Sequence, residues 1–351
     1  MKAGRWLFGA PLDLAVFVGP ALLALLLVAM APLLGVSEGE TPEWGWIVAV
    51  LFVDVAHVWS TIAVTYLDPV ELARRRIVFA IVPVAGWMIG VTLYAAGPLV
   101  FWRALAYLAV FHFVRQQFGW VMLYRARCGE RDRLGRWLDG ALIYATTLYP
   151  LIAWHARLPR RFWWFVPGDF APGVPAVCAA VAGWIYVALA VVYVARAVRR
   201  RGPVNWGKHL VMATTAACWY VGIVALDSDF AFTITNVLIH GVPYLALIWM
   251  YGRGLAATDV QSRGGVGARW LAHGVLVFLA TLWAIAFVEE LIWDRAVWHD
   301  RAWLFGAGGD WQGWHVVLVP LLAVPQLTHY VLDGFLWRRA YNPRLGAALG
   351  G

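Results

Sequence analysis

Four histidines of this 351-residue chain lie inside apolar stretches, where ionisable side chains are rare. They are His57, His112, His240 and His329, each in a separate stretch. Placing an ionisable side chain at the middle of a bilayer costs roughly 2.5–3.5 kcal/mol, so such a residue indicates a functional site. Because imidazole nitrogens are ligands of iron, zinc and copper, the first chemistry to consider is metal binding.

Two of these histidines have a carboxylate at helical spacing. Asp54 precedes His57 by three residues, and Asp333 follows His329 by four. Residues three or four apart share one face of a helix. A metal-bound histidine usually donates its other N–H to a carboxylate or a carbonyl. We therefore expect the two aspartates either as further metal ligands or as partners that orient the histidines.

The other two histidines have amide side chains nearby. Asn236 precedes His240 by four residues, and Gln116 lies in the same stretch as His112. An amide can hydrogen-bond an imidazole without competing strongly for a metal. We expect both amides beside the metal ligands rather than among them.

Arg115 and Tyr330 are the candidates for catalytic roles. Arg115 lies within an apolar stretch, where it either forms an internal ion pair with Asp54 or Asp333 or receives a carboxylate or phosphate group of a substrate. Tyr330 directly follows His329 and could supply a proton. Both roles need the helices that carry these residues to meet in one place.

The composition indicates what those elements are. Hydrophobic residues make up 62% of the chain and charged residues 14%, and the mean hydropathy is +0.69. An ordinary soluble domain is about 45–50% apolar and about 25% charged. This balance excludes a soluble enzyme, a disulfide-stapled secreted domain and a disordered chain. The 23 tryptophans are typical of a membrane protein, because tryptophan collects at the headgroup level.

We predict an all-α fold, a polytopic bundle of about ten transmembrane helices, since a spanning helix needs about 20 apolar residues. Their approximate ranges are 11–35, 43–67, 77–96, 98–124, 138–157, 174–196, 209–226, 230–252, 269–289 and 314–336. We expect residues 1–351 to form a single membrane domain. The segment of about 290–313 is expected as an interfacial cap on the outer side, with Glu289 and Glu290 as a solvated end of the preceding helix.

The basic residues orient the predicted bundle. Most of the 28 lysines and arginines fall at the N-terminus and in alternate loops, on one side of the predicted membrane. Such an excess marks the cytoplasmic side, so both termini are expected in the cytoplasm. The net charge of +8 is then explained by orientation and by contact with anionic lipids, without a nucleic acid. The opposite side holds Arg103, Arg157, Arg160, Arg161, Arg295 and Arg301.

This orientation places all four histidines in one layer. The spans that carry them are the second, fourth, eighth and tenth, which all run from the outer side to the cytoplasm. Each histidine precedes the cytoplasmic end of its helix by about 7 to 12 residues, a depth of roughly 10–18 Å. Four histidines at one depth favour metal ligation, with a proton pathway and structural hydrogen bonding as the alternatives.

A redox metal suits such a site better than a structural zinc, and non-haem iron is the first choice, with zinc, copper and haem as alternatives. A metal inside a bilayer is reached by lipid-soluble molecules, so we expect a lipid, carotenoid or hydrocarbon as substrate. The predicted function is a non-haem iron oxygenase, with an electron donor as a further partner. The alternatives are a proton-coupled transporter and a haem-binding electron carrier.

Three short segments resemble motifs of the Brp/Blh carotene-cleaving dioxygenases, polytopic proteins of bacteria and archaea. The segments are 111–113 (Phe-His-Phe), 239–241 (Ile-His-Gly) and 329–338, which begins His-Tyr-Val-Leu-Asp. The early His-Gly-x-x-Asp pattern and the paired histidines of that family are absent. The resemblance implies a membrane fold, an iron site and a carotenoid substrate, and we expect a multi-pass protein of a bacterial inner membrane. It assigns the iron to His57, His112, His240 and His329.

Overall fold

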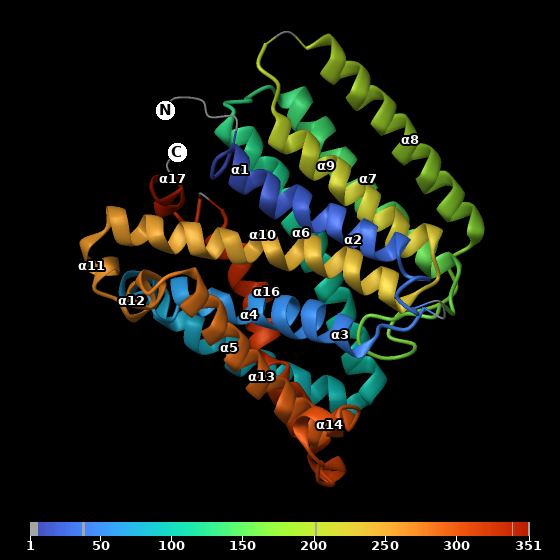
Figure 1. Cartoon of the computed structure of the whole chain (residues 1–351), viewed down its shortest axis with the longest axis vertical. Helices are drawn as coiled ribbons and strands as arrows, with labels where there is room; N and C mark the ends of the chain where they lie inside the picture. The colour runs from blue at the N-terminus through green and yellow to red at the C-terminus, as the bar shows by residue number, and fades with distance from the viewer. Residues whose placement is uncertain (1–5, 37–38, 201, 339, 350–351) are drawn as a thin grey trace. The chain divides into compact units, whose positions relative to one another are not determined.

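The computed structural model describes residues 6–36, 39–200, 202–338 and 340–349 and is all-helical over them, without a strand (Figure 1). Lys2, Arg5, Arg201 and Arg339, which entered the charge count, lie outside the described residues. Eight of the described helices are long and apolar enough to cross a membrane, as expected of a multi-pass membrane protein. They are Ala10–Ala29, Glu43–Val64, Pro69–Ala96, Pro98–Arg127, Ala176–Arg199, Asp229–Thr258, Val275–Trp298 and Gln312–Leu336.

The two other predicted spans are helical as well. The range 138–157 lies in α7 (Arg133–Ala156), and 209–226 covers most of α9 (Trp206–Trp219) and the π-helical turn η4 (Tyr220–Ala225). Neither helix is among the eight candidate spans. The count of ten and the cytoplasmic placement of the termini therefore stay predictions.

The chain divides into two compact units, and the first comprises residues 1–49 and 109–243. Its N-terminal part is α1 (Ala10–Asp13), a π-helical turn and α2 (Gly19–Ala29). Helix α8 (Ala176–Arg199) packs along α7, which also contacts α9 (Figure 1). The end of α6 (Pro98–Arg127) and the start of α10 (Asp229–Thr258) complete this unit and carry His112 and His240.

A buried ionic network holds one end of the first unit together. Glu130, between α6 and α7, is bonded to Lys208 of α9 at 2.7 Å and to Arg125 at 3.0 Å. Asp139 of α7 accepts from the same two cations, and from Lys208 at 3.0 Å. Because every charge in this network has a partner, the loop between α6 and α7 is tied to α9.

The second unit comprises residues 50–108 and 244–351. Helix α5 (Pro69–Ala96) packs against α15 (His315–Leu322) and α16 (Val324–Leu336), while α13 (Val275–Trp293) packs against α4 (Ala56–Ser60). The first helical stretch of the unit carries His57 on α4, and α16 carries His329.

The helices that carry these two histidines are irregular beside them. A π-helical segment, η2 (Trp46–Val55), precedes α4, and a 3₁₀ turn, η3 (Thr61–Val64), follows it. The predicted helix over 314–336 is interrupted at Ala323, between Pro320 and Pro325, since proline cannot donate the helical hydrogen bond. Departures from α-helical geometry of this kind are frequent at functional sites.

Candidate metal centre

In the second unit, His57 and His329 are buried and lie against each other. Their ring centroids are 4.9 Å apart and the rings are nearly perpendicular. Thr61 Oγ1 lies 2.8 Å from Nδ1 of His329, and Asp54 Oδ1 lies 3.5 Å from Nδ1 of His57. Asp54 therefore lies next to His57, as its spacing predicts, and Thr61 lies next to His329.

Tyr244 links the pair to Asp333. Its hydroxyl donates to Asp333 Oδ1 at 2.5 Å and lies 3.0 Å from Thr61 Oγ1. Trp337 donates to the same carboxylate oxygen at 3.0 Å. The other oxygen of Asp333 lies 3.9 Å from Nε2 of His329. A buried chain of contacts thus runs from Asp333 through Tyr244 and Thr61 to Nδ1 of His329, which fixes the orientation of that imidazole.

Thr61 and Tyr244 were not among the sequence candidates. Thr61 follows His57 by four residues, and Tyr244 follows His240 by four, so each carried the same helical spacing that identified the aspartates. Hydroxyl side chains are common within apolar helices, where they bond their own backbone, so spacing alone did not distinguish these two.

In the first unit, His112 and His240 form a second buried pair. Their ring centroids are 5.0 Å apart at an interplanar angle of 80°. Phe113 stacks on His240 at 3.6 Å, with the rings nearly parallel. The amide of Gln116 donates to the backbone carbonyl of His240 at 2.8 Å. Gln116 therefore holds the backbone of α10 at the histidine.

The four histidines also form one group that could hold a metal ion. One potential ligand nitrogen from each ring lies within 4.8 Å of the other three. The donor set fits a transition metal, because imidazole nitrogen suits iron, zinc and copper. This four-histidine group confirms the clustering that the sequence predicts.

Two further predicted site residues, Asn236 and Arg115, lie in the first unit. Asn236 donates to the carbonyl of Phe232 at 2.9 Å, within its own helix. Arg115 donates to the hydroxyl of Tyr144, and its guanidinium lies 4.7 Å from the centre of the Phe118 ring. These contacts hold both side chains in the first unit and leave their roles toward a substrate as predictions.

Tyr330 and Asp54 lie in the second unit. The amide of Gln326 donates to the Tyr330 hydroxyl at 2.7 Å, and the Tyr330 ring lies 5.8 Å from that of His329. The Asp54 side chain keeps 27% of its surface exposed, while its buried Oδ1 has no hydrogen-bond donor among the described residues. Asp54 therefore has an acceptor available on the side of His57.

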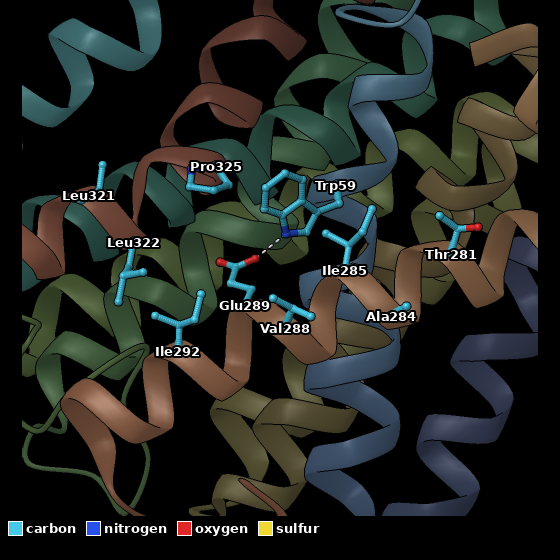
Figure 2. A pocket seen from close by; sticks show the side chains of 10 residues that line it. All are labelled: Trp59, Thr281, Ala284, Ile285, Val288, Glu289, Ile292, Leu321, Leu322 and Pro325. Atoms are coloured by element: carbon cyan, nitrogen blue, oxygen red, sulfur yellow. Dashed lines mark hydrogen bonds between the residues drawn. The ribbon is translucent and has the colours of Figure 1, made fainter. Parts of the chain in front are cut away.

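An apolar pocket of 490 Å³ lies in the second unit, lined by α4, α13, α15 and α16 (Figure 2). Its one ionisable lining residue, among those the structure describes, is Glu289, whose carboxylate accepts a hydrogen bond from the indole of Trp59. The expectation of a solvated helix end at Glu289 is wrong, because α13 continues to Trp293 and the carboxylate is half-buried. The lining residues are Trp59, Thr281, Ala284, Ile285, Val288, Glu289, Ile292, Leu321, Leu322 and Pro325.

The expected outer cap also takes a definite form. After α13 the chain makes a π-helical turn, η5 (Asp294–Trp298), and a short helix, α14 (Ala302–Phe305). Asp294 accepts from the backbone amides of Asp300 and Arg301, at 3.0 and 2.8 Å, which closes the turn between them. Its place at the outer membrane surface stays a prediction.

Comparison with family models, with curated proteins and with solved structures gives no match to this chain. The resemblance of the short histidine segments to the carotene-cleaving dioxygenases stays a prediction. What the protein does is therefore inferred from the four-histidine group and its surroundings.

Proposed function

We propose that this protein is a membrane-embedded metalloenzyme that holds iron at His57, His112, His240 and His329 and oxidises a lipophilic molecule. The observation that carries the proposal is the four-histidine group, in which one nitrogen of each buried ring lies within 4.8 Å of the others. Four buried imidazoles so close together cannot all be protonated, because like charges at this distance repel strongly in an apolar interior. As neutral rings they are good ligands for a transition metal.

The chain's own residues would orient the metal ligands and exclude water from them. The contacts from Asp333 through Tyr244 to Thr61 hold the ring of His329, leaving Nε2 as its ligand atom. Phe113 covers one face of the His240 ring and keeps water from it. Bound iron would supply the activation of dioxygen that these side chains cannot. Tyr330 and Arg115 are the candidates to move a proton and to bind a polar end of the substrate.

Iron without haem suits the geometry of each pair better than haem. Two imidazoles on opposite faces of a haem have ring centroids about 6 Å apart, given nitrogen–metal bonds of about 2 Å. The centroids here are 4.9 and 5.0 Å apart and the rings meet edge to face. To fit between the two rings, a haem would have to move the histidines of each pair apart.

The setting supports a lipophilic substrate. The helices that carry the histidines are candidate membrane spans, so molecules dissolved in the bilayer are the ones that can reach them. We place the protein in a bacterial inner membrane, with membrane lipids and an electron donor as its other partners. The short histidine segments favour a carotenoid among the substrates of this class.

The first test is the metal content of protein purified in mild detergent without a chelator. We expect about one iron per chain by elemental analysis and no Soret band in the absorption spectrum. His57→Ala and His240→Ala should each lose most of the metal, whereas His273→Ala, at an exposed histidine, should keep it. Absence of any stoichiometric transition metal would overturn the metal site, and a Soret band would replace iron by haem.

The second test addresses the substrate class. Iron-loaded protein in lipid nanodiscs is incubated with β-carotene under air, with and without ascorbate as an electron donor, and products are separated by chromatography. We expect an oxygen-dependent cleavage product that is lost in His57→Ala. Unchanged β-carotene with a normal iron content would overturn the carotenoid assignment and leave the metal site standing.

A further inference from the structure

The apolar pocket of the second unit has an exposed, apolar rim. Its rim is formed by side chains with large exposed fractions, 52% for Val288, 43% for Ile292 and 49% for Leu321. These residues belong to helices that are candidate membrane spans. In a bilayer, their exposed surfaces would face lipid rather than water, so the pocket is accessible sideways from the hydrocarbon layer.

One carboxylate is placed inside this apolar lining. Glu289 lies on α13 within the candidate span Val275–Trp298, where ionisable residues are costly and functional by default. One of its oxygens accepts from the Trp59 indole, and Trp293 also interacts with the carboxyl group. Figure 2 shows the other oxygen pointing away from Trp59, on the side of Pro325. A carboxylate has about four acceptor sites, so two indole donors leave capacity for a further one.

Two lining residues of the pocket are near neighbours in sequence of the His57–His329 pair. Trp59 follows His57 by two residues, and Pro325 precedes His329 by four. On α16 a separation of four residues is one helical turn, about 6 Å along the axis. A molecule seated against Pro325 would therefore lie about one helical turn from the backbone of His329.

We propose that this pocket binds a long apolar molecule with a terminal hydroxyl group, such as a fatty or polyene alcohol, with the hydroxyl donating to Glu289. The apolar part would lie against Ile285, Val288 and Leu322, so it would stay in apolar surroundings like those of the lipid. A hydrocarbon would leave the Glu289 acceptor unused, and a fatty acid anion would bring a second acceptor against it. The alcohol would be bound in addition to the substrate of the metal centre, so this inference goes beyond the proposed function and does not need the metal.

The test is photoaffinity labelling of the full chain in nanodiscs. The probe is an octadecanol with a diazirine in mid-chain, and the matched probe is its methyl ether, which cannot donate a hydrogen bond. We expect the alcohol to label segments 281–292 and 321–325 and to bind about tenfold more tightly than the ether, the effect of one hydrogen bond. Equal labelling by the two probes would overturn the role of Glu289.

Two sets of variants locate the site. Val288→Trp should fill the pocket and abolish labelling by both probes. Val277→Trp is the control, because it makes the same change at an exposed position three turns earlier on α13, outside the lining. Glu289→Leu should bind the alcohol no better than the ether, whereas Glu289→Gln keeps an acceptor and should retain part of the preference. Labelling that is insensitive to Val288→Trp would overturn the pocket as the binding site.

Two separate measurements, labelling and metal content, distinguish the failure of the pocket proposal from the failure of the metal proposal. Labelling is carried out with metal-depleted protein, and the metal content is measured on the untreated protein of each variant. Selective labelling in a chain that holds no metal would leave the pocket standing and overturn the metalloenzyme. A full metal content with unselective labelling would leave the metal site standing and overturn the pocket as an alcohol-binding site. Retention of the metal by Val288→Trp would also show that the variant folds.

Discussion

At the scale of single residues, the surroundings of the histidines matter as much as their clustering. A free imidazole rotates and offers either nitrogen to a metal, whereas His329 has Nδ1 fixed at 2.8 Å from Thr61. Tyr244 in turn bridges Thr61 and Asp333, so three side chains fix one ring. Asp333 accepts from Tyr244 and Trp337 through one oxygen, an arrangement that favours orientation of His329 over direct metal binding.

Removing the Tyr244 hydroxyl should weaken the metal site without removing a ligand. Tyr244→Phe leaves the ring but breaks the link between Asp333 and Thr61, and partners of this kind typically contribute 10–100-fold to metal affinity. We therefore expect a loss of about 10–100-fold in a competition titration against a chelator. Tyr220→Phe, at a tyrosine that is 49% exposed, is the matched control. Equal affinities of the two variants would contradict the role given to this hydroxyl.

At the scale of elements, small residues decide how closely the helices approach. On α5, a β-carbon added at Gly90 would lie 2.8 Å from Cβ of Pro320, inside van der Waals contact. One turn earlier, a β-carbon added at Gly86 would meet nothing closer than 3.8 Å. Helix α15 therefore packs against α5 at Gly90, just before the break at Ala323 that sets the start of α16.

These two glycines give a matched pair of substitutions. Gly90→Ala should push α15 away from α5 and destabilise the protein by about 1–3 kcal/mol, the usual cost of overpacking. Gly86→Ala should be neutral or slightly stabilising, because alanine favours a helix over glycine by about 1 kcal/mol. The measurement is thermal unfolding in detergent. A stability of Gly90→Ala equal to that of Gly86→Ala would show that the helices do not pack this closely.

At the scale of the whole molecule, the sequence predicts more of the elements than of their contacts. The hydropathy of the sequence predicts each apolar helix. The free-energy cost of burying an ionisable group in a membrane identifies the four histidines, so both features can be predicted from the sequence alone. The role of Tyr244 depends on Asp333 and Thr61, which lie on other helices, and no spacing within one helix encodes that meeting. Glu289 was mistaken for a helix end for the same reason, because its partner Trp59 is distant in the sequence.

The ionic network around Glu130 makes a prediction about stability and pH. Burial acts to raise the pKa of Glu130, but the hydrogen bond and charge of Lys208, with Asn205 and Arg200, outweigh it and hold the pKa below the ordinary 4.5. A carboxyl group whose pKa is lower in the folded state stabilises the protein above its unfolded pKa. That stabilisation is lost as the pH falls through the folded value, when Glu130 takes up a proton.

Glu130→Gln keeps the shape of the side chain and removes its charge, which leaves Lys208 and Arg125 with one carboxylate fewer. Breaking a buried ion pair in this way costs about 3–5 kcal/mol, so at pH 7 the variant should unfold at a clearly lower temperature than the natural chain. The difference should shrink as the pH is lowered below about 4.5, since protonation then removes the same charge from the natural chain. Glu40→Gln, at an exposed glutamate, should match the natural chain throughout. A difference between Glu130→Gln and the natural chain that stays constant from pH 7 to pH 3 would mean that the charge of Glu130 does not hold α9 to the loop between α6 and α7.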